Sequence, residues 1–241
     1  MKTIMIKGPI ISNGEKWIYD LFEEDSTCPN DVIKALPDDN SEVTVIINSG
    51  GGYVDCGNEI YTALKSYAGN VIVDIIEAAS AASVIAMAGD TIRITPVGQL
   101  MIHNVSCISS GDYHTMDKTS EILQKANQSI SSAYQLKTGL SQEELLAMMD
   151  KETRMTAEEA KEKGFVDEIL FQKEEGMILV ANCKELLPQN IISTMQKWKN
   201  GENSLQSMIR QEVEKAMKQS NENSSNGIRE PEKHRNRFFF I

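Results

Sequence analysis

The sequence predicts an α/β fold, and three apolar runs followed by helical patterns carry this prediction. Residues 3–7, 43–47 and 71–76 are rich in β-branched side chains, which is typical of strands. The two later runs are nearly continuous in apolar character, as expected of strands buried on both faces of a sheet. Strand and helix signals alternate as far as Phe171, which indicates a wound α/β domain.

Helical segments follow in order between and after these strands. Helices are expected from about Val54 onward and from Ser80 to Gly89, where the glycine ends the helical spacing. Residues 111–138 form one long predicted helix with apolar side chains along one side. The capping-box patterns Ser141–Glu144 and Thr156–Glu159 begin two shorter helices.

Length and composition limit the class of protein. At 241 residues and 41% hydrophobic content, the chain can bury one large core. A net charge of -11 argues against nonspecific nucleic-acid binding, which needs a basic face. The N-terminal residues lack the continuous apolar run of a signal peptide, and Asp74 and Glu77 make a membrane span at 71–89 costly. We therefore expect a cytoplasmic protein that binds neither nucleic acid nor membrane.

The cysteines predict reduced thiols, because they are scattered and form no C-x-x-C pair. His103, Cys107 and His114 are conceivable metal ligands, but their spacing matches no zinc pattern. The sequence thus predicts neither a metal nor a cofactor. The four cysteines are Cys28, Cys56, Cys107 and Cys183.

Ser80 stands where the strand at 71–76 gives way to a helix. A hydroxyl in that place lies at a helix N-terminus, where unpaired amides and the helix dipole favour negative charge. Alanines flank it on both sides, as a sharp turn with an exposed nucleophile requires. The alternative is an ordinary serine helix cap. The nucleophile hypothesis therefore depends on the partners of Ser80.

The loop Asn48–Gly52 is the first candidate partner. Three successive glycines between a strand and a helix leave backbone amides bare of side chains. Such amides can bind an oxyanion or a phosphate. Neither common phosphate-binding glycine pattern occurs here, and a simple flexible turn is the other alternative.

His103 is the second candidate partner and the best-placed general base. The chain has three histidines. His114 lies in a polar segment and His234 in a polar tail, whereas His103 ends an apolar strand that can hold its ring. A purely structural histidine is the alternative.

These motifs resemble the Clp protease proteolytic subunit, a serine peptidase with the ClpP/crotonase fold, and most closely its phage and prophage head-maturation relatives. The resemblance extends from about Ile4 to Phe171. It rests on four motifs in the family's order, which are Ile47–Gly52, Ala78–Ser83 with Ala88-Gly89, Met101-Ile-His103, and Asp150–Ala160 with Gly164–Asp167.

The resemblance implies a catalytic triad of Ser80, His103 and Asp150. It also implies an oxyanion hole formed by the backbone amides of Gly51 and Ala81. In such a triad the histidine moves the serine proton and the carboxylate orients the imidazole. Glu152 is a nearby rival to Asp150 as the acidic member.

The resemblance further implies stacked ββα units with a protruding handle helix at 111–138. It implies homo-oligomers, as a heptameric ring or double ring. Gly50 replaces the proline of the cellular enzyme's loop, and Glu77-Ala78 replaces its Gly-Gln. The short sequence before the first strand leaves little from which to form axial loops, so docking to an ATP-dependent unfoldase is doubtful.

Three regions are expected along the chain. Residues 1–175 form the peptidase domain, 176–217 an amphipathic helical extension, and 218–241 a disordered tail with an aromatic end. We expect a head-maturation endopeptidase that processes capsid or scaffold proteins. The alternatives are a peptidase that works with an unfoldase and an inactive or crotonase-like assembly module.

Overall fold

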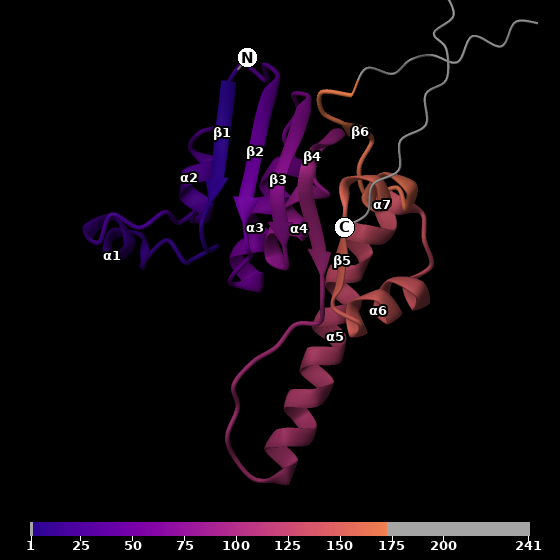
Figure 1. Cartoon of the computed structure of the whole chain (residues 1–241). Helices are drawn as coiled ribbons and strands as arrows, with labels where there is room; N and C mark the ends of the chain where they lie inside the picture. The colour runs from indigo at the N-terminus through magenta and orange to yellow at the C-terminus, as the bar shows by residue number, and fades with distance from the viewer. Residues whose placement is uncertain (1, 173–241) are drawn as a thin grey trace, which may run out of the picture. The chain divides into compact units, whose positions relative to one another are not determined.

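The computed structural model describes residues 2–172. These residues belong to one compact unit, Met1–Glu174. The predicted extension at 176–217 and tail at 218–241 lie outside the described residues. The elements shown in Figure 1 are β1 (Lys2–Lys7), α1 (Lys16–Leu21), α2 (Pro29–Ile33), β2 (Val43–Ser49), α3 (Val54–Lys65), β3 (Val71–Ala79), α4 (Ala81–Ala86), β4 (Thr91–Ile102), α5 (Tyr113–Thr138), α6 (Gln142–Asp150), β5 (Thr153–Met155), α7 (Ala157–Glu162) and β6 (Glu168–Ile169).

The strands form one sheet in the order β1-β2-β3-β4-β5, with β6 also paired to β4. Neighbours from β1 to β4 run parallel, whereas β5 runs antiparallel to the end of β4. Each parallel connection carries at least one helix, as such crossovers require. The predicted α/β class is therefore confirmed. The carboxyl ends of β2, β3 and β4 meet at one edge, where ligands of α/β sheets commonly bind.

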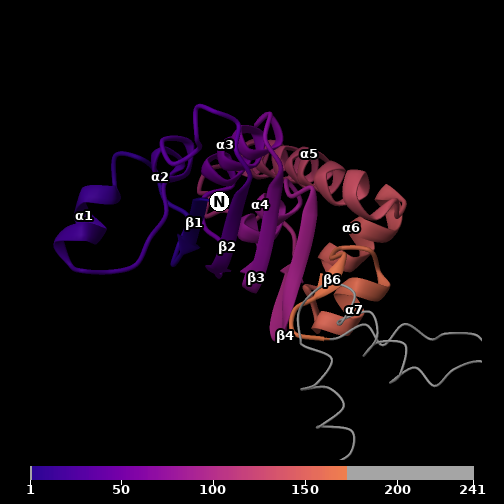
Figure 2. The ribbon, with the colours of Figure 1, turned by 90° about the horizontal axis from the view of Figure 1, so that it is seen from above.

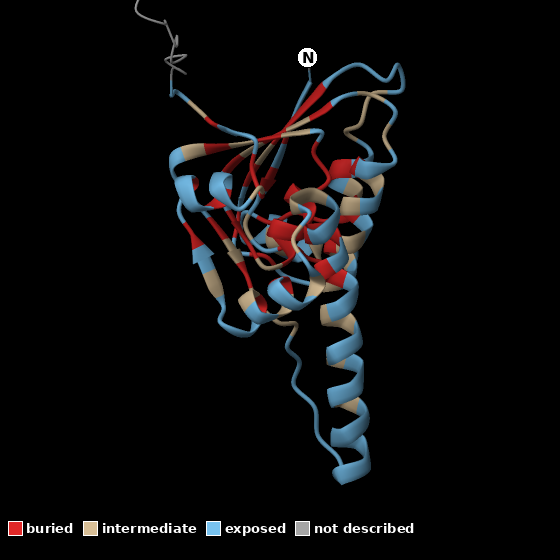
Figure 3. Ribbon diagram, turned by 90° about the vertical axis from the view of Figure 1, so that its right-hand side faces the viewer, coloured by how far each residue is buried: buried red, intermediate tan, exposed pale blue. Residues whose placement is uncertain are grey.

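The core lies between one face of this sheet and the helices. Figure 2 shows α3 and α5 along the same side of β1–β4. Figure 3 shows the buried residues concentrated there. The largest fully buried side chains of the strands are Ile6, Ile47, Ile75, Ile92 and Ile94.

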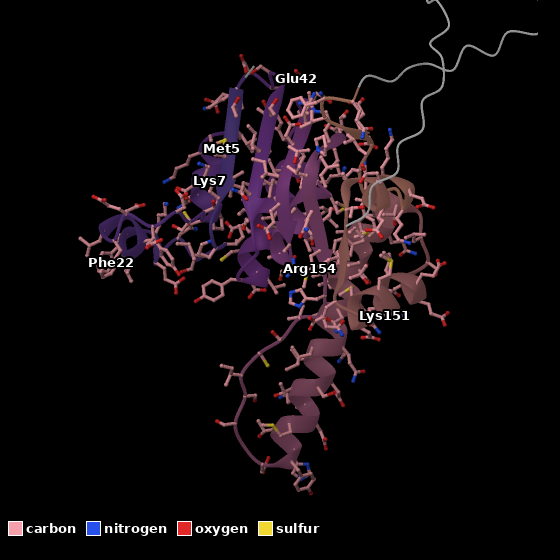
Figure 4. The ribbon with its side chains drawn as sticks, in the orientation of Figure 1. Met5, Lys7, Phe22, Glu42, Lys151 and Arg154 are labelled. Carbon is pink, nitrogen blue, oxygen red and sulfur yellow. The ribbon has the colours of Figure 1, made fainter. Side chains whose placement is uncertain are left out.

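The expectation that the strands are buried on both faces is wrong. The register aligns Met5, Ile46, Asp74 and Arg93 in one row across β1–β4, and all four are at least partly exposed. Figure 4 labels Met5 on this part of β1. Asp74 and Arg93 form a two-pronged ion pair of 2.6 and 2.8 Å there. A continuous apolar run cannot by itself tell two-sided from one-sided burial.

Helix α5 is long and only its C-terminal half joins the core. Its buried residues are Ile130, Ser131, Ala133 and Tyr134, and its N-terminal half projects from the body (Figures 1 and 3). The helix begins at Tyr113 rather than Gly111 because the Asp112 side chain caps it through Thr115 N.

Helix α4 is shorter than predicted. It ends at Ala86, and its last turns close through bonds from Met87, Ala88 and Gly89 to carbonyls three residues earlier. A Cβ on Gly89 would lie 2.7 Å from Val73 Cγ2. Gly89 therefore serves close packing on β3 rather than helix termination. Helices α1 and α2 were not predicted, since each has only 6 or 5 residues.

Candidate active site

Ser80 occupies a strained turn between β3 and α4. Its backbone has φ 56 and ψ −126, a conformation that side-chain-bearing residues seldom adopt. Such strain persists only where the surroundings impose it, and it is concentrated at functional sites. The Ser80 side chain makes no capping hydrogen bond to α4. The alternative of an ordinary serine cap is therefore wrong.

Hydrogen bonds from β4 and from the start of α4 hold this turn. Ser80 N donates to Met101 O on β4 at 3.0 Å, where Ala79 and Met101 are register partners. Ser80 O accepts bonds from Ser83 N at 3.0 Å, from Val84 N at 3.4 Å and from Ser83 Oγ at 2.6 Å. Both sides of the Ser80 backbone are thus fixed, one by the sheet and one by the first turn of α4.

The glycine loop packs directly against this turn. A Cβ on Gly51 would lie 2.6 Å from Ser80 Cβ and 3.0 Å from Ala81 N, and Gly51 has φ +99. On its other side, a Cβ on Gly52 would lie 2.1 Å from Ile10 O. Gly50 has open space around it. Two of the three glycines are therefore required by close backbone contacts, and the simple flexible turn is not what the loop forms.

The two predicted oxyanion donors differ in their present bonding. Within residues 2–172, Ala81 N has no hydrogen-bond acceptor, so this amide is available to a ligand. Gly51 N donates to Ser49 Oγ at 3.1 Å. The Ser49 hydroxyl in turn donates to Gly8 O at 2.6 Å. The Gly51 amide would have to share or exchange this bond to meet a substrate.

Ser80 and His103 line the same pocket. Because β3 and β4 pair in parallel, the two residues leave the sheet at the same edge. The pocket encloses about 70 Å³, and α5 contributes Ile130 to its wall. The described hydrogen bonds include none between the Ser80 hydroxyl and the His103 imidazole. The remaining lining residues are Gly52, Val54, Gly57, Asn58, Ala81, Val84, Asn104, Val105 and Ser106.

Asp150, the last residue of α6, lies beside this pocket through a contact with Asn104. Asn104 Nδ2 donates to Asp150 Oδ1 at 2.7 Å. Asn104 Oδ1 is buried without a partner among the described residues. No hydrogen bond joins Asp150 to His103 within residues 2–172. The Asp150 carboxylate is thus bound by Asn104, the residue that follows His103 in the sequence.

Glu152 directly precedes β5, the strand that pairs with the end of β4 just before His103. Antiparallel pairing matches Leu100 with Met155 and Ile102 with Thr153. The pairing ends at Thr153, and one further step of the same register would set Glu152 opposite His103, where cross-strand side chains interact. Glu152 has φ 49, so the strand ends at this residue. Figure 4 labels its neighbours, Arg154 on β5 and Lys151 below it.

Other sequence candidates lie elsewhere or outside the described residues. His114 stands on the first turn of α5 against the Tyr113 ring, with centroids 3.9 Å apart. His234 and Cys183 fall outside the described residues. Within residues 2–172, Cys28, Cys56 and Cys107 are free thiols. In that same stretch, no cluster of His, Cys, Asp or Glu could hold a metal ion. None of its helices combines the length and apolar character that a membrane span requires.

Sequence reasoning missed several residues that the fold brings to the site. Asn104 follows His103 directly, and a polar residue beside a candidate base was a usable signal. Ser83 lies one helical turn after Ser80, so its contact with the Ser80 carbonyl was also foreseeable. The helical pattern placed Ile130 and Tyr134 on the apolar side of the long helix, but no local signal indicated that they reach the site, because α5 is distant in sequence.

Comparison with known proteins shows the family of the chain. The profile of the family described as Clp protease matches residues 25–173. The ATP-dependent Clp protease proteolytic subunit of Bacteroides fragilis is 31% identical over 139 residues, which are 56% of this chain and 67% of the relative. Proteolytic subunit 1 of Chlamydia abortus is 32% identical over 141 residues, 56% of this chain and 73% of the relative. Subunit 1 of Thermobifida fusca is 30% identical over 170 residues, 65% and 74% respectively. The chain therefore belongs to the Clp protease family and has its ClpP-like α/β fold.

Proposed function

We propose that this chain is a serine endopeptidase in which Ser80 is the nucleophile and His103 the general base. One observation carries the proposal: Ser80 is held in a strained turn at the wall of a pocket that it shares with His103. Strain of this kind, in a nucleophile that makes no capping bond, is typical of a serine presented to substrate.

The proposed reaction is acyl transfer to Ser80 followed by hydrolysis. Ser80 Oγ attacks the scissile carbonyl while His103 accepts the hydroxyl proton, and His103 then returns that proton to the leaving amine. The Ala81 and Gly51 amides stabilise the oxyanion, at about 3 kcal/mol per donor. Water then cleaves the acyl-enzyme by the reverse proton path.

Two bonds have to change before this reaction. The Ser80 hydroxyl and the His103 imidazole need to form a hydrogen bond, and such bonds often tighten only when substrate is bound. The Gly51 amide also has to turn from Ser49 Oγ toward the pocket or divide its hydrogen between both acceptors. Substrate binding in the pocket supplies a reason for both changes.

We assign the acidic role to Asp150, with Glu152 as its competitor. Asp150 is already fixed beside the site by Asn104 at 2.7 Å. Supporting Glu152 is the strand register, which points to a position opposite His103. The proposal of a serine peptidase holds with either carboxylate, since both would orient the imidazole from the same edge of the sheet.

We further propose that the substrates are capsid or scaffold proteins of a phage or prophage, cleaved during head maturation in a bacterial cytoplasm. The motif departures at Gly50 and Glu77-Ala78 support this narrower assignment. The 68 residues from 174 to 241, beyond the segment that the family profile matches, support it as well. The apolar part of the pocket wall, formed by Val54, Val84 and Ile130, suits a small apolar substrate side chain.

Co-expression with a phage major capsid protein tests the assignment. Wild-type protein should shorten the capsid protein, whereas Ser80→Ala should leave it full length without affecting assembly. If a fluorophosphonate labels Ser80 of the wild-type enzyme but the capsid protein stays uncleaved, the proposed substrate class is rejected and the peptidase activity is not. No labelling at Ser80 of the folded chain would reject the peptidase and favour an inactive assembly module.

The relatives' names favour one alternative, a peptidase that works with an ATP-dependent partner. That function predicts that a host unfoldase and ATP together stimulate degradation of a folded substrate. For either function we propose a ring-shaped homo-oligomer. Sedimentation of the same protein measures its mass. ATP-stimulated degradation would replace the head-maturation assignment.

A further inference from the structure

A buried chain of hydrogen bonds connects the Ser80 turn to helix α5. Ser83 Oγ lies 2.6 Å from Ser80 O and 2.8 Å from the hydroxyl oxygen of Tyr134. Ser83 is 0% exposed and Tyr134 is 1% exposed. Buried polar groups cost free energy unless they are paired, and here each has its partner. The chain of bonds thus joins α4 to α5 through two residues that are 51 positions apart in the sequence.

The direction of both hydrogen bonds follows from the number of hydrogens. A serine hydroxyl has one hydrogen, and a backbone carbonyl can only accept. The Ser83 hydrogen therefore goes to Ser80 O, and Tyr134 must donate its own hydrogen to Ser83 Oγ. Burial raises the pKa of Tyr134, which keeps its hydroxyl protonated and able to donate.

The carbonyl at the end of this chain belongs to the same peptide unit as the Ala81 amide. That unit is planar and trans, since the described backbone contains no cis peptide bond. The Ser80 oxygen and the Ala81 N–H therefore point in opposite directions and turn together. The Ser83 hydroxyl makes the shortest of the bonds to this oxygen, which also accepts from the amides of Ser83 and Val84. Anchoring the oxygen fixes the direction of the one proposed oxyanion donor that has no acceptor among the described residues.

We propose that Ser83 and Tyr134 are positioning residues that hold the Ser80–Ala81 peptide plane, so that the Ala81 amide points at the developing oxyanion. This inference rests on the proposed peptidase function. Neither side chain touches the substrate: Ser83 acts through the Ser80 carbonyl, and Tyr134 acts through Ser83.

The surroundings of Tyr134 give this anchor a fixed origin. Its ring packs edge-on against the buried Phe165, with centroids 5.8 Å apart. Ile130, one helical turn earlier on α5, lines the pocket. The same stretch of α5 therefore forms part of the pocket wall and sets the orientation of the proposed oxyanion donor.

The test is a double-mutant cycle on the full chain with a fluorophosphonate probe. The maximal labelling rate of Ser80 and the probe concentration for half-maximal rate are measured for Tyr134→Phe, Ser83→Ala and the double variant. Losing a buried hydrogen bond should lower the maximal rate about tenfold in Ser83→Ala and by a smaller factor in Tyr134→Phe. The half-saturating concentration should stay unchanged, since the pocket wall is intact.

The double variant separates a linear chain of bonds from two independent contacts. Without Ser83 the Tyr134 hydroxyl has no route to Ser80, so the double variant should label no more slowly than Ser83→Ala alone. Rates that multiply in the double variant would overturn the inference. So would wild-type labelling rates in both single variants.

Two matched controls identify a merely structural effect. Ser131→Ala removes a buried hydroxyl of α5 that donates to Gln128 O and accepts from Gln142 Nε2, and Tyr61→Phe removes a phenol that makes no hydrogen bond with described residues. Both controls should label at the wild-type rate, and all variants are compared by thermal unfolding. If Ser131→Ala is labelled as slowly as Ser83→Ala, the inference is overturned. An unlabelled wild-type chain would remove the proposed function and this inference with it, whereas a labelled wild type with unaffected variants removes the inference alone.

Discussion

The backbone amide of Ser80 donates a hydrogen bond to the carbonyl of Met101, at 3.0 Å, across the junction of β3 and β4. His103 is the second residue after that carbonyl, so the bond ties the strained serine to the strand that presents the histidine. Parallel pairing of Ala79 with Met101 extends the same connection into the sheet. The separation of nucleophile and base is therefore a property of the sheet register, and substitutions near it have definite expected effects.

Replacing Ser80 by Gly should give a more stable protein than replacing it by Ala. Both variants lack the nucleophile and should not react with a fluorophosphonate. At φ 56 and ψ −126 glycine is strained least, and we expect an advantage of about 1 kcal/mol after the entropy of the unfolded glycine chain is counted. Urea unfolding measures the difference. At Ser132, on the exposed side of α5, the order should reverse because alanine is the better helix former. Equal stability of both Ser80 variants would show that the turn is unstrained.

Asp150→Asn and Glu152→Gln distinguish the two candidate acids. We expect Asp150→Asn to lower the turnover rate by about 10³- to 10⁴-fold, because the imidazole loses its orienting carboxylate. Glu152→Gln should lower it by a much smaller factor. Asn104→Ala, which frees the Asp150 carboxylate from its present partner, serves as the companion variant. A larger loss in Glu152→Gln than in Asp150→Asn would transfer the acidic role to Glu152.

Gly51→Ala and Gly50→Ala form a matched pair within one loop. A Cβ on Gly51 would lie 2.6 Å from Ser80 Cβ at a backbone φ of +99, so this variant should lose about 2 kcal/mol of stability and most of its activity. Gly50 has no heavy atom within 4 Å of its added Cβ. Gly50→Ala should be neutral or stabilise by up to about 1 kcal/mol. Thermal unfolding and fluorophosphonate labelling measure both effects, and equal tolerance of the two changes would contradict the close packing of the loop.

The cap of α6 should make stability depend on pH in the acid range. The hydroxyl and then the backbone amide of Ser141 lower the pKa of Glu144 by donating hydrogen bonds to its carboxylate. A lowered pKa in the folded state means that the stabilisation is present above the ordinary carboxyl pKa. It disappears as the pH falls through the lowered value.

Glu144→Gln should therefore melt below the wild type near neutral pH, and the difference should vanish in acid. Thermal unfolding between neutral and acidic pH measures it. Glu143→Gln, in the same helical turn but outside the capping box, should show no such convergence. A melting difference that persists unchanged into acid would mean that the carboxylate charge contributes nothing to the cap.

Much of this protein could be predicted from local sequence signals. The alternation of β-branched runs with helical patterns predicted the strand and helix order, since each signal depends on neighbouring residues only. Ser80, the glycine loop and His103 were found because each follows a strand, and parallel strands end at one edge of their sheet. Short helices such as α1 were not predicted, because 6 residues contain too few helical turns for a periodic apolar pattern to be detected.

Contacts between distant segments were decided only by the tertiary structure. Three contacts join residues from different elements: the bond between Asn104 and Asp150, the pairing of β5 with the end of β4, and the chain of hydrogen bonds from Tyr134 to Ser80. The partial exposure of Met5, Ile46, Asp74 and Arg93 was also decided by the tertiary structure, because it depends on whether a layer of helices covers that face of the sheet. Local sequence states what a residue can do; which groups it meets depends on strand register and helix packing, which no single segment encodes.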